Sequence, residues 1–282
     1  MLLADVAYAR PTSLEDAVAL LSEHDGARAL AGGQTLVNVL KQRAAQLDVL
    51  VDLGALPELR TIGFGPGGEL ELGAMVTSTQ LIESSEVEVT RPILAEVART
   101  IADVQVRNRG TIGGNVCVND PTNHYPPLLV ALGASFTVRG AAGERVVPAE
   151  EFFLGVYLTA VGPGELLTTI SVPPPGGQGD GFAGVSLGRH GTYIVDAAAT
   201  VGPQGVRVAI GCVDAVPVRA TALEEALADG DLSERAVVAA AAGLGATLDP
   251  PSDVHASADY RRHLAEVSAV RAVLQAAERA RG

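Results

Sequence analysis

The first part of the chain alternates between helical and extended patterns of apolar positions. Apolar side chains recur at helical spacing over 14–21, directly after a segment in which Thr12 or Ser13 suits the N-cap. The same region holds two strand-length apolar runs and one further helical pattern, at 27–31, 49–53 and 35–43. Together these patterns predict a small α+β unit that ends near Gly54.

A second unit follows, in which the apolar positions have a different spacing. Polar and apolar residues alternate on both sides of the glycine-rich stretch 65–68, which predicts a hairpin between 60–64 and 69–74. A proline pair at 126 and 127 opens a short apolar helix that Gly133 ends. The other elements predicted here are helices at 79–84 and 91–106 and strands at 135–139, 145–148 and 165–172.

The stretch 173–181, rich in proline and glycine, is the clearest linker in the sequence, and we place the main domain boundary there. Three antiparallel strands are predicted beyond it, at 181–188, 194–201 and 206–212, followed by helices at 220–228, 233–244 and 256–281. The pattern therefore predicts an α+β protein with a first domain at 1–175, in lobes of about 1–55 and 56–175, and a second at 180–282.

Composition narrows the classes of function. The chain has 282 residues, and its 20 basic and 33 acidic residues give a net charge of −13, which repels nucleic acid. Cys117 and Cys212 are the two cysteines, and the five histidines form no ligand pattern, so a metal site within this chain is not expected. No apolar run reaches bilayer length and no signal peptide is visible, so we expect a soluble protein of the reducing cytoplasm, without a membrane span.

Two glycine pairs carry the candidate chemistry. Gly32-Gly33 follows a strand-like run and precedes a helical pattern, an arrangement that aims free N–H groups at a phosphate. Gly113-Gly114 lies in a predicted turn whose N–H groups we expect to be unsatisfied and to converge on an anion. Neither pair belongs to a GxGxxG fingerprint or a P-loop. The alternative is that both pairs only permit tight turns.

Taken together, Ala31-Gly32-Gly33-Gln34-Thr35-Leu36-Val37 and Thr111-Ile112-Gly113-Gly114-Asn115 resemble the paired FAD-pyrophosphate motifs of the flavoprotein (medium) subunit of molybdenum hydroxylases. That family includes aerobic carbon monoxide dehydrogenase and bacterial xanthine dehydrogenase. The likeness runs from 8–11 near the start to 260–264 near the end. It implies a two-lobed FAD-binding domain of the PCMH or vanillyl-alcohol-oxidase type, followed by a smaller α+β domain with a three-stranded antiparallel sheet and helices.

The resemblance also implies roles for individual residues. It assigns cofactor binding to Ala31, Gly32, Gly33, Gln34, Thr35, Leu36, Thr111, Gly113, Gly114 and Asn115. Relatives often carry an aspartate where this chain has His124, and that aspartate is taken to bind the ribityl chain of FAD. Either Asp120 takes over this role or the flavin is held differently, although an Asp-Pro pair is also a common loop initiator. Tyr125, in place of a more usual aliphatic residue, is a second departure.

The loop 189–193 is placed over the isoalloxazine ring by the resemblance, with Tyr193 shielding it. The alternative reading makes Tyr193 an ordinary hairpin residue. Arg189 and Arg219 are two candidates for a positive charge near the reduced flavin, and the sequence favours neither. Cys117 reads as a small buried apolar residue in preference to a redox thiol, because no neighbouring cysteine could resolve an oxidised form.

By resemblance the function is electron transfer through one non-covalent FAD. The electrons come from iron–sulfur clusters of a small partner subunit, which a molybdenum-pterin centre on a large subunit reduces, and they leave to an acceptor such as NAD, a quinone or oxygen. The assembly expected is a dimer of heterotrimers. Two alternatives remain at this stage: a self-contained FAD oxidase or dehydrogenase of the vanillyl-alcohol-oxidase fold, and a non-enzymatic nucleotide-binding scaffold.

Overall fold

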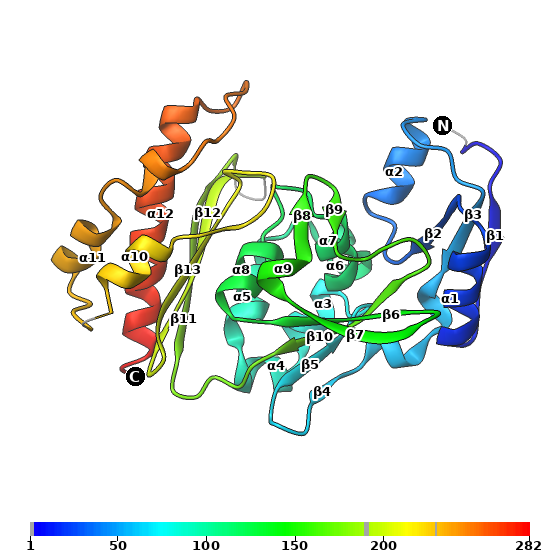
Figure 1. Ribbon diagram of the computed structural model, residues 1–282, viewed down its shortest axis with the longest axis horizontal. Coiled ribbons are helices and arrows are strands. Elements are labelled where there is room, and N and C mark those ends of the chain that lie inside the picture. The colour runs from blue at the N-terminus through cyan, green and yellow to red at the C-terminus, as the bar shows by residue number, and fades with distance from the viewer. Residues whose placement is uncertain (1–2, 189–191, 229) are drawn as a thin grey trace.

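The computed structural model describes residues 3–188, 192–228 and 230–282. Three main sheets stand side by side along the longest axis of the molecule (Figure 1). The strand β1 (Ala7–Ala9), near the start of the described chain, belongs to the first sheet, and the C-terminus lies beside the third, at the opposite end of the molecule. No helix in the described part of the chain combines the length and apolar character that crossing a bilayer requires.

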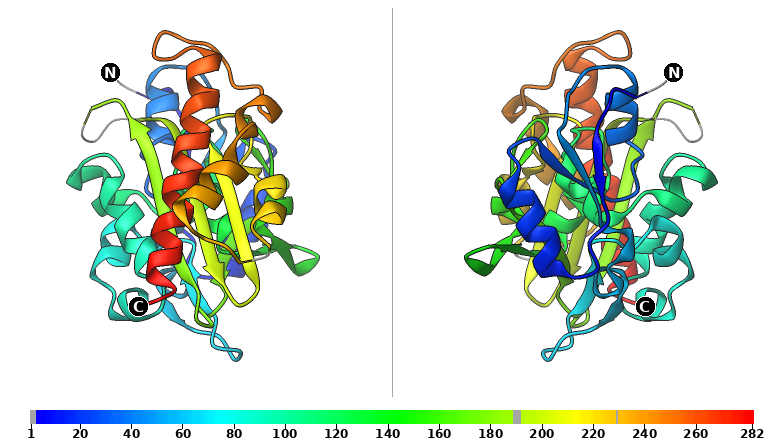
Figure 2. Two further views of the ribbon diagram at one scale, coloured as in Figure 1. Left: turned by 90° about the vertical axis from the view of Figure 1, so that its left-hand side faces the viewer. Right: turned by 90° about the vertical axis from the view of Figure 1, so that its right-hand side faces the viewer.

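The N-terminal lobe is a parallel three-stranded sheet in the order β1-β3-β2, with α1 packed on it (Figure 2, right). Its Ser13 N-cap accepts a hydrogen bond from the Asp16 N–H at 3.1 Å, as the sequence predicts. In α2 only Leu40 is buried, so most of the predicted apolar side of that helix is only partly covered. The bounds are β1 Ala7–Ala9, α1 Leu14–Glu23, β2 Ala27–Leu30, α2 Leu36–Lys41, β3 Val49–Asp52, and the 3-10 turns Leu53–Ala55 and Pro57–Arg60.

The second lobe is built on a five-stranded antiparallel sheet in the order β4-β5-β10-β6-β7. Its strands are β4 Ile62–Phe64, β5 Leu70–Gly73, β6 Ser135–Gly140, β7 Gly143–Pro148 and β10 Leu166–Val172, with a small hairpin of β8 Phe153–Gly155 and β9 Leu158–Thr159. Its helices are α3 Ser78–Glu83, α4 Ser85–Thr90, α5 Pro92–Thr100, α6 Val104–Arg109, α7 Ile112–Val118, α8 Tyr125–Ala131 and α9 Ala149–Phe152. The largest hydrophobic core of the molecule lies between these helices and the sheet.

The single helix predicted over 91–106 is wrong, because the chain breaks between α5 and α6. Ala102 has a positive φ of 40°, and Asp103 caps the new helix by accepting from the Val106 N–H at 2.9 Å. The Arg107 guanidinium donates to the carbonyls of Ile101 and Ala102 at 2.8 and 2.9 Å, which satisfies backbone groups freed by the break. The helical spacing of apolar residues continues across this break, so the sequence pattern does not reveal it.

The C-terminal part is an antiparallel sheet in the order β11-β12-β13-β14. Its strands are β11 Gly179–Ser186, β12 Tyr193–Gly202, β13 Gly205–Gly211 and β14 Val218–Arg219, and its helices are α10 Thr221–Ala226, α11 Glu234–Ala241 and α12 Ala258–Arg279, with a 3-10 turn at Leu244–Thr247. The three predicted strands are present, and the two-residue β14 is an addition that the hydrophobic pattern is too short to reveal. The long α12 lies across the outer face of this sheet (Figure 2, left).

The other face of the C-terminal sheet packs on α8 and α5 of the second lobe (Figure 1). Strand β12 is buried on both faces: Ala197 and Ala199 belong to the core beneath α12, whereas Ala198 belongs to the central core. Asp196 and Thr200 lie on the same face of β12 as Ala198, because side chains two residues apart in a strand share a face. The Thr200 hydroxyl donates to the carbonyl of Ala131 at the end of α8 at 3.4 Å. The inner face of the sheet therefore brings Asp196 to the second lobe.

The predicted linker is held rigidly in place by one arginine. The Arg91 side chain is fully buried and pairs with both carboxylate oxygens of Asp180 at 2.9 Å. It also donates to the carbonyls of Pro173 and Pro174 and to the side chain of Gln178. Strand β11 begins within the predicted linker, so its last residues belong to the sheet. The short segment between β10 and β11 is thus a clamped connection, not a flexible one.

Candidate cofactor site

The segments that hold the two glycine pairs, far apart in the sequence, approach each other closely. A Cβ atom added to Gly32 would lie 2.0 Å from the carbonyl oxygen of Arg109, just before the second pair. A Cβ on Gly113 would lie 2.4 Å from the Ala74 carbonyl oxygen, and one on Gly114 would lie 3.6 Å from the Ala31 Cβ. Three of these glycines therefore serve close approach, which any larger residue would prevent at Gly32 and Gly113.

The first pair has a backbone suited to an anion. Within the described part of the chain, the N–H groups from Gly32 to Leu36 donate to no protein atom, and Thr35 makes no side-chain cap. Gly33 has φ +71°, in the left-handed region, whereas the Gln34 side chain turns back to donate to the Gly32 carbonyl at 3.0 Å. A run of unpaired amides at the start of a helix provides hydrogen-bond donors for a phosphate group.

The second pair differs from its predicted form. Thr111 is the N-cap of α7, and Gly113 and Gly114 lie in the first turn of that helix with φ outside the left-handed region. The N–H groups of Ile112, Gly113 and Gly114 donate to the Val76 carbonyl, the Ala74 carbonyl and the Thr111 hydroxyl at 2.9, 3.0 and 3.0 Å. The expectation of unsatisfied donors here is wrong, because the capping threonine and the neighbouring backbone already use them.

Two polar atoms of this second segment remain for a ligand. The Thr111 hydroxyl accepts from Gly114 but donates to no acceptor in the described residues, and the Asn115 Oδ1 atom is buried without a hydrogen-bond partner among them. A buried polar atom left unpaired is unusual and calls for a partner. The free N–H groups of the first segment and the Thr111 hydroxyl therefore fit a phosphate group, whereas the Asn115 Oδ1 atom, an acceptor, fits a hydroxyl of the same cofactor.

Asp120 forms a loop of its own directly after α7. Its Oδ1 atom accepts from the N–H and hydroxyl of Thr122 at 2.9 and 2.8 Å, which is the geometry of a loop initiator. Its Oδ2 atom accepts from the Tyr157 hydroxyl at 3.2 Å. Asn123 ties the same loop to α7 by donating to the Asn115 carbonyl at 3.0 Å. A role of Asp120 at the flavin stays a prediction.

His124 is buried at the start of α8, where it meets a residue that sequence reasoning missed. Its Nδ1 atom lies 3.2 Å from Oδ2 of Asp196, and the two residues are 7% and 0% exposed. Burial raises the pKa of the Asp196 carboxyl, while the hydrogen bond from His124 lowers it. The signal that could have found Asp196 is a lone carboxylate inside the apolar run of β12.

Three rings gather around this pair. The Tyr193 ring lies edge-on to His124 with centroids 4.4 Å apart, and Phe182 lies 6.2 Å from His124 and 5.9 Å from Tyr193. Tyr193 is half-buried, and this burial raises the pKa of its hydroxyl. Its packing against His124 is more specific than the hairpin alternative requires, whereas Arg189 of the same loop falls outside the described residues.

Two further candidate residues, Tyr125 and Cys117, lie in positions that indicate a structural role. Tyr125 is fully buried in the central core and donates to the Ser78 hydroxyl at 3.3 Å. Cys117 packs against the same core, and burial raises the pKa of its thiol to about 12. Such a thiol is almost entirely protonated at neutral pH, which disfavours redox or nucleophilic chemistry.

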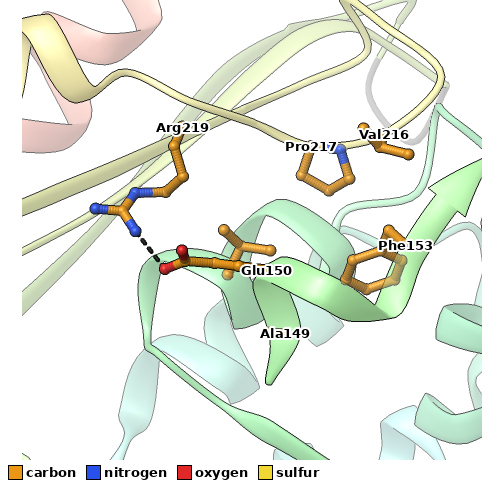
Figure 3. Close-up of a pocket in the computed structure, with 7 residues that line it drawn as sticks. Ala149, Glu150, Phe153, Val216, Pro217 and Arg219 are labelled. Carbon is orange, nitrogen blue, oxygen red and sulfur yellow. Dashed lines mark hydrogen bonds and ion pairs between the residues drawn. The ribbon is translucent and has the colours of Figure 1, made fainter. Parts of the chain in front are cut away.

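Arg219 lines a separate cavity of about 50 Å³ between α9 and the chain after β13 (Figure 3). Its guanidinium pairs with Glu150, as the dashed line shows, and with both carboxylate oxygens of Glu224. Glu150 also pairs with Arg207. The charge of Arg219 is therefore engaged within the protein, which does not favour it as the cation near a flavin.

Comparisons with known proteins identify the family of the chain. A family model described as the FAD binding domain in molybdopterin dehydrogenase matches residues 4–175, and one described as the CO dehydrogenase flavoprotein C-terminal domain matches 196–276. The chain is 39% identical to the carbon monoxide dehydrogenase medium chain of Afipia carboxidovorans, covering 97% of each chain. It is 34% identical to the nicotine 6-hydroxylase medium subunit of Paenarthrobacter nicotinovorans, covering 99% of this chain and 100% of the relative.

A solved structure of quinoline 2-oxidoreductase from Pseudomonas putida 86 superposes with a TM-score of 0.94 at 33% identity, covering 99% of each chain. The sequence and structural likenesses thus span both the FAD-binding region and the C-terminal sheet. The chain belongs to the family of FAD-binding medium subunits of molybdenum hydroxylases of the carbon monoxide dehydrogenase and xanthine dehydrogenase type.

Proposed function

We propose that this chain is the electron-transfer subunit of a multi-subunit molybdenum hydroxylase, holding one FAD between its two glycine segments. The observation that carries the proposal is the run of unpaired amides from Gly32 to Leu36, set against the N-terminal end of α7. The family membership identifies the anion that such a cradle would take as the FAD pyrophosphate.

The two segments have different tasks in this proposal. The N–H groups of Gly32, Gly33, Gln34, Thr35 and Leu36 would donate to the phosphate oxygens, and the positive φ of Gly33 belongs to the turn that holds these groups. Gly113 and Gly114 make no such bonds. Gly113 lets α7 approach the backbone of Ala74, and Gly114 lies beside Ala31 of the first segment, next to Thr111 and Asn115 in the chain. This division replaces the equal roles expected from the sequence.

The chain's residues bind and shield the flavin, and bound FAD supplies the capacity to accept and release electrons. His124 and Tyr193 form the wall at the flavin end of the site, and their mutual packing gives that wall a fixed shape. The chain's residues do not hydroxylate the substrate in this proposal. That reaction belongs to a partner subunit.

Partners follow from the relatives, which are named medium chains or medium subunits. We propose a small iron–sulfur subunit as the electron donor, a large molybdenum-pterin subunit as the hydroxylase, and a dimer of heterotrimers as the assembly. A cytoplasmic location is proposed from the two free thiols. The acceptor is NAD, a quinone or oxygen.

The test is co-expression of this chain with a small iron–sulfur subunit and a large molybdenum-pterin subunit from the same organism, followed by size-exclusion chromatography. We expect one species that contains all three chains, iron, molybdenum and FAD, and that hydroxylates a substrate. An isolated chain that turns over an organic substrate steadily with FAD alone would overturn the proposal and support the self-contained oxidase.

A further inference from the structure

Asp196 is a carboxylate in a place that ordinarily holds an apolar residue. It is fully buried on the inner face of β12, in line with Ala198 and Thr200. Its Oδ2 atom lies 3.2 Å from Nδ1 of His124, and its Oδ1 atom has no hydrogen-bond partner in the described residues. Burying a carboxylate is costly unless it is paired, so Asp196 depends on His124 for its stability as an anion.

The pair joins the two domains that the family models separate. His124 lies within the FAD-binding region 4–175, and Asp196 lies at the start of the C-terminal region 196–276. On the other side of His124, Asn123 holds the Asn115 carbonyl of the second glycine segment. Asp196 is therefore connected to the second glycine segment through His124 and the neighbouring Asn123, although it is not itself part of that segment.

We propose that Asp196 is a positioning residue for His124: its carboxylate accepts the Nδ1–H, fixes the ring against Tyr193, and makes the pair a proton store for the flavin. The inference rests on the proposed function, which places His124 beside the cofactor. A flavin that had taken up two electrons beside this pair would carry added negative charge, which would favour a positive neighbour. His124 would then bind one proton from solvent at Nε2 and keep its Nδ1–H on Asp196.

Other titratable groups face the pair, and they do not replace it. Burial raises the pKa of the Tyr193 hydroxyl and the Cys212 thiol, which keeps both neutral near pH 7. Arg261 of α12 reaches the carbonyls of Ile194 and Cys212 at 2.5 and 3.5 Å, and its charge is engaged by Asp253. Asp120 contributes negative charge from the loop after α7. None of these groups therefore takes the place of the His124 imidazole beside Asp196.

The first arm of the test uses the FAD-free chain and imidazole nitrogen chemical shifts, with His124 assigned by loss of its signal in His124→Gln. In the wild type we expect the proton of the His124 ring to lie on Nδ1, where the Asp196 carboxylate accepts it. In Asp196→Asn, which keeps the shape but removes the charge, the Nδ1 and Nε2 chemical shifts of His124 should move, because the Nδ1–H loses its carboxylate acceptor. Asp249→Asn, a fully exposed carboxylate of the C-terminal region, should leave His124 unchanged. An unchanged His124 in Asp196→Asn overturns the inference.

The second arm uses the FAD-loaded chain and the midpoint potential of the flavin between about pH 5.5 and 8. The potential should depend more steeply on pH in the wild type than in Asp196→Asn or His124→Gln, by up to about 30 mV per pH unit, one proton per two electrons. The double variant should lose no more than either single variant, because the two residues act as one unit. His263→Gln, an exposed histidine on α12, is the matched control and should keep the wild-type slope.

The two arms separate this inference from the proposed function. FAD binding with the same pH slope in wild type, Asp196→Asn and His124→Gln overturns the proton store and leaves the FAD site standing. A wild-type chain that binds no FAD overturns the proposed function and the inference with it. If Asp196→Asn does not fold, His124→Gln tests the pair instead, because it removes the imidazole and leaves the carboxylate.

Discussion

At the scale of single residues, the four glycines of the two motifs have separate reasons to be glycine. Gly33 is the one with a left-handed backbone, whereas Gly32 and Gly113 make room for another backbone segment. The sequence identifies all four as important because they form two pairs next to helical patterns. It cannot assign their separate roles, since the contact partners Arg109 and Ala74 lie far away in the chain.

Gly33→Val should lower FAD affinity at least tenfold while leaving the chain folded. A β-branched residue at φ +71° is strained, and its Cβ would lie 3.0 Å from the Val37 side chain, so the amide run would turn away from the phosphates. Gly68→Val is a matched control, because Gly68 also has a positive φ, of +86°, but lies on an open hairpin. Fluorescence titration with FAD measures the effect, and equal affinity in both variants would show that Gly33 serves only the turn.

Gly114→Val should also weaken FAD binding, through a different cause. The new Cβ would lie 2.9 Å from the Thr111 hydroxyl, which caps α7, and would press on the Ala31 side of the first segment. The loss of the cap should lower stability by about 1 kcal/mol. Thermal unfolding and FAD titration together test this, and a variant with wild-type affinity would remove Gly114 from the site.

Both thiols should be unreactive in the native protein. Burial raises the pKa of Cys117 to about 12 and that of Cys212 well above its ordinary value, so the thiolate is scarce at pH 8. Iodoacetamide should label neither cysteine in the folded chain and both in urea. Fast labelling of native Cys117 would restore the redox reading set aside above.

At the scale of elements, the sequence predicts well where one local signal suffices. The N-cap of α1, the proline start of α8 and the strand pair β12–β13 all appear at the expected places. It fails where a distant residue decides. The linker looks flexible because of its prolines and glycines, and only the buried Arg91 makes it rigid. Gly179 and Gly181 look like linker residues but bring β11 against the backbone of α12.

Arg91→Met should be strongly destabilising, because it leaves Asp180 as an unpaired charge in a buried site. The expected loss in the free energy of unfolding is about 3–5 kcal/mol. The double variant Arg91→Met/Asp180→Leu should recover much of that loss, since it removes both charges. Arg279→Met, which breaks a half-exposed pair with Glu96, is the control and should cost far less. Urea unfolding checks the order, and a double variant as unstable as the single one would contradict it.

At the scale of the whole molecule, the fold class and two-part division follow from the hydrophobic pattern. The way the parts meet does not. Strand β12 carries apolar residues on both faces, which indicates burial on both sides, but the sequence does not say that α8 is the partner of the inner face. The sequence therefore does not single out Asp196, because the role of Asp196 depends on its contact with His124 at the start of α8.

The isolated chain should show no substrate-hydroxylating activity and should still oxidise NADH slowly or react with oxygen. The proposed function places hydroxylation at a molybdenum centre on another subunit, whereas bound flavin itself is competent for both slow reactions. Activity assays on the purified FAD-loaded chain, with and without the partner subunits, measure both. Hydroxylation by the chain alone at the rate of the full complex would refute the relay.

The central claim is that the amide run from Gly32 to Leu36 holds the pyrophosphate of one non-covalent FAD. Calorimetric titration of the cofactor-free chain with FAD and with FMN, which has the same ring but one phosphate and no adenosine, tests it most directly. We predict one FAD per chain, fully released by acid, and FMN binding at least about tenfold weaker, a difference of about 1.4 kcal/mol. Equal affinity for the two flavins, or a flavin that stays attached to the peptide after acid treatment, would contradict the account.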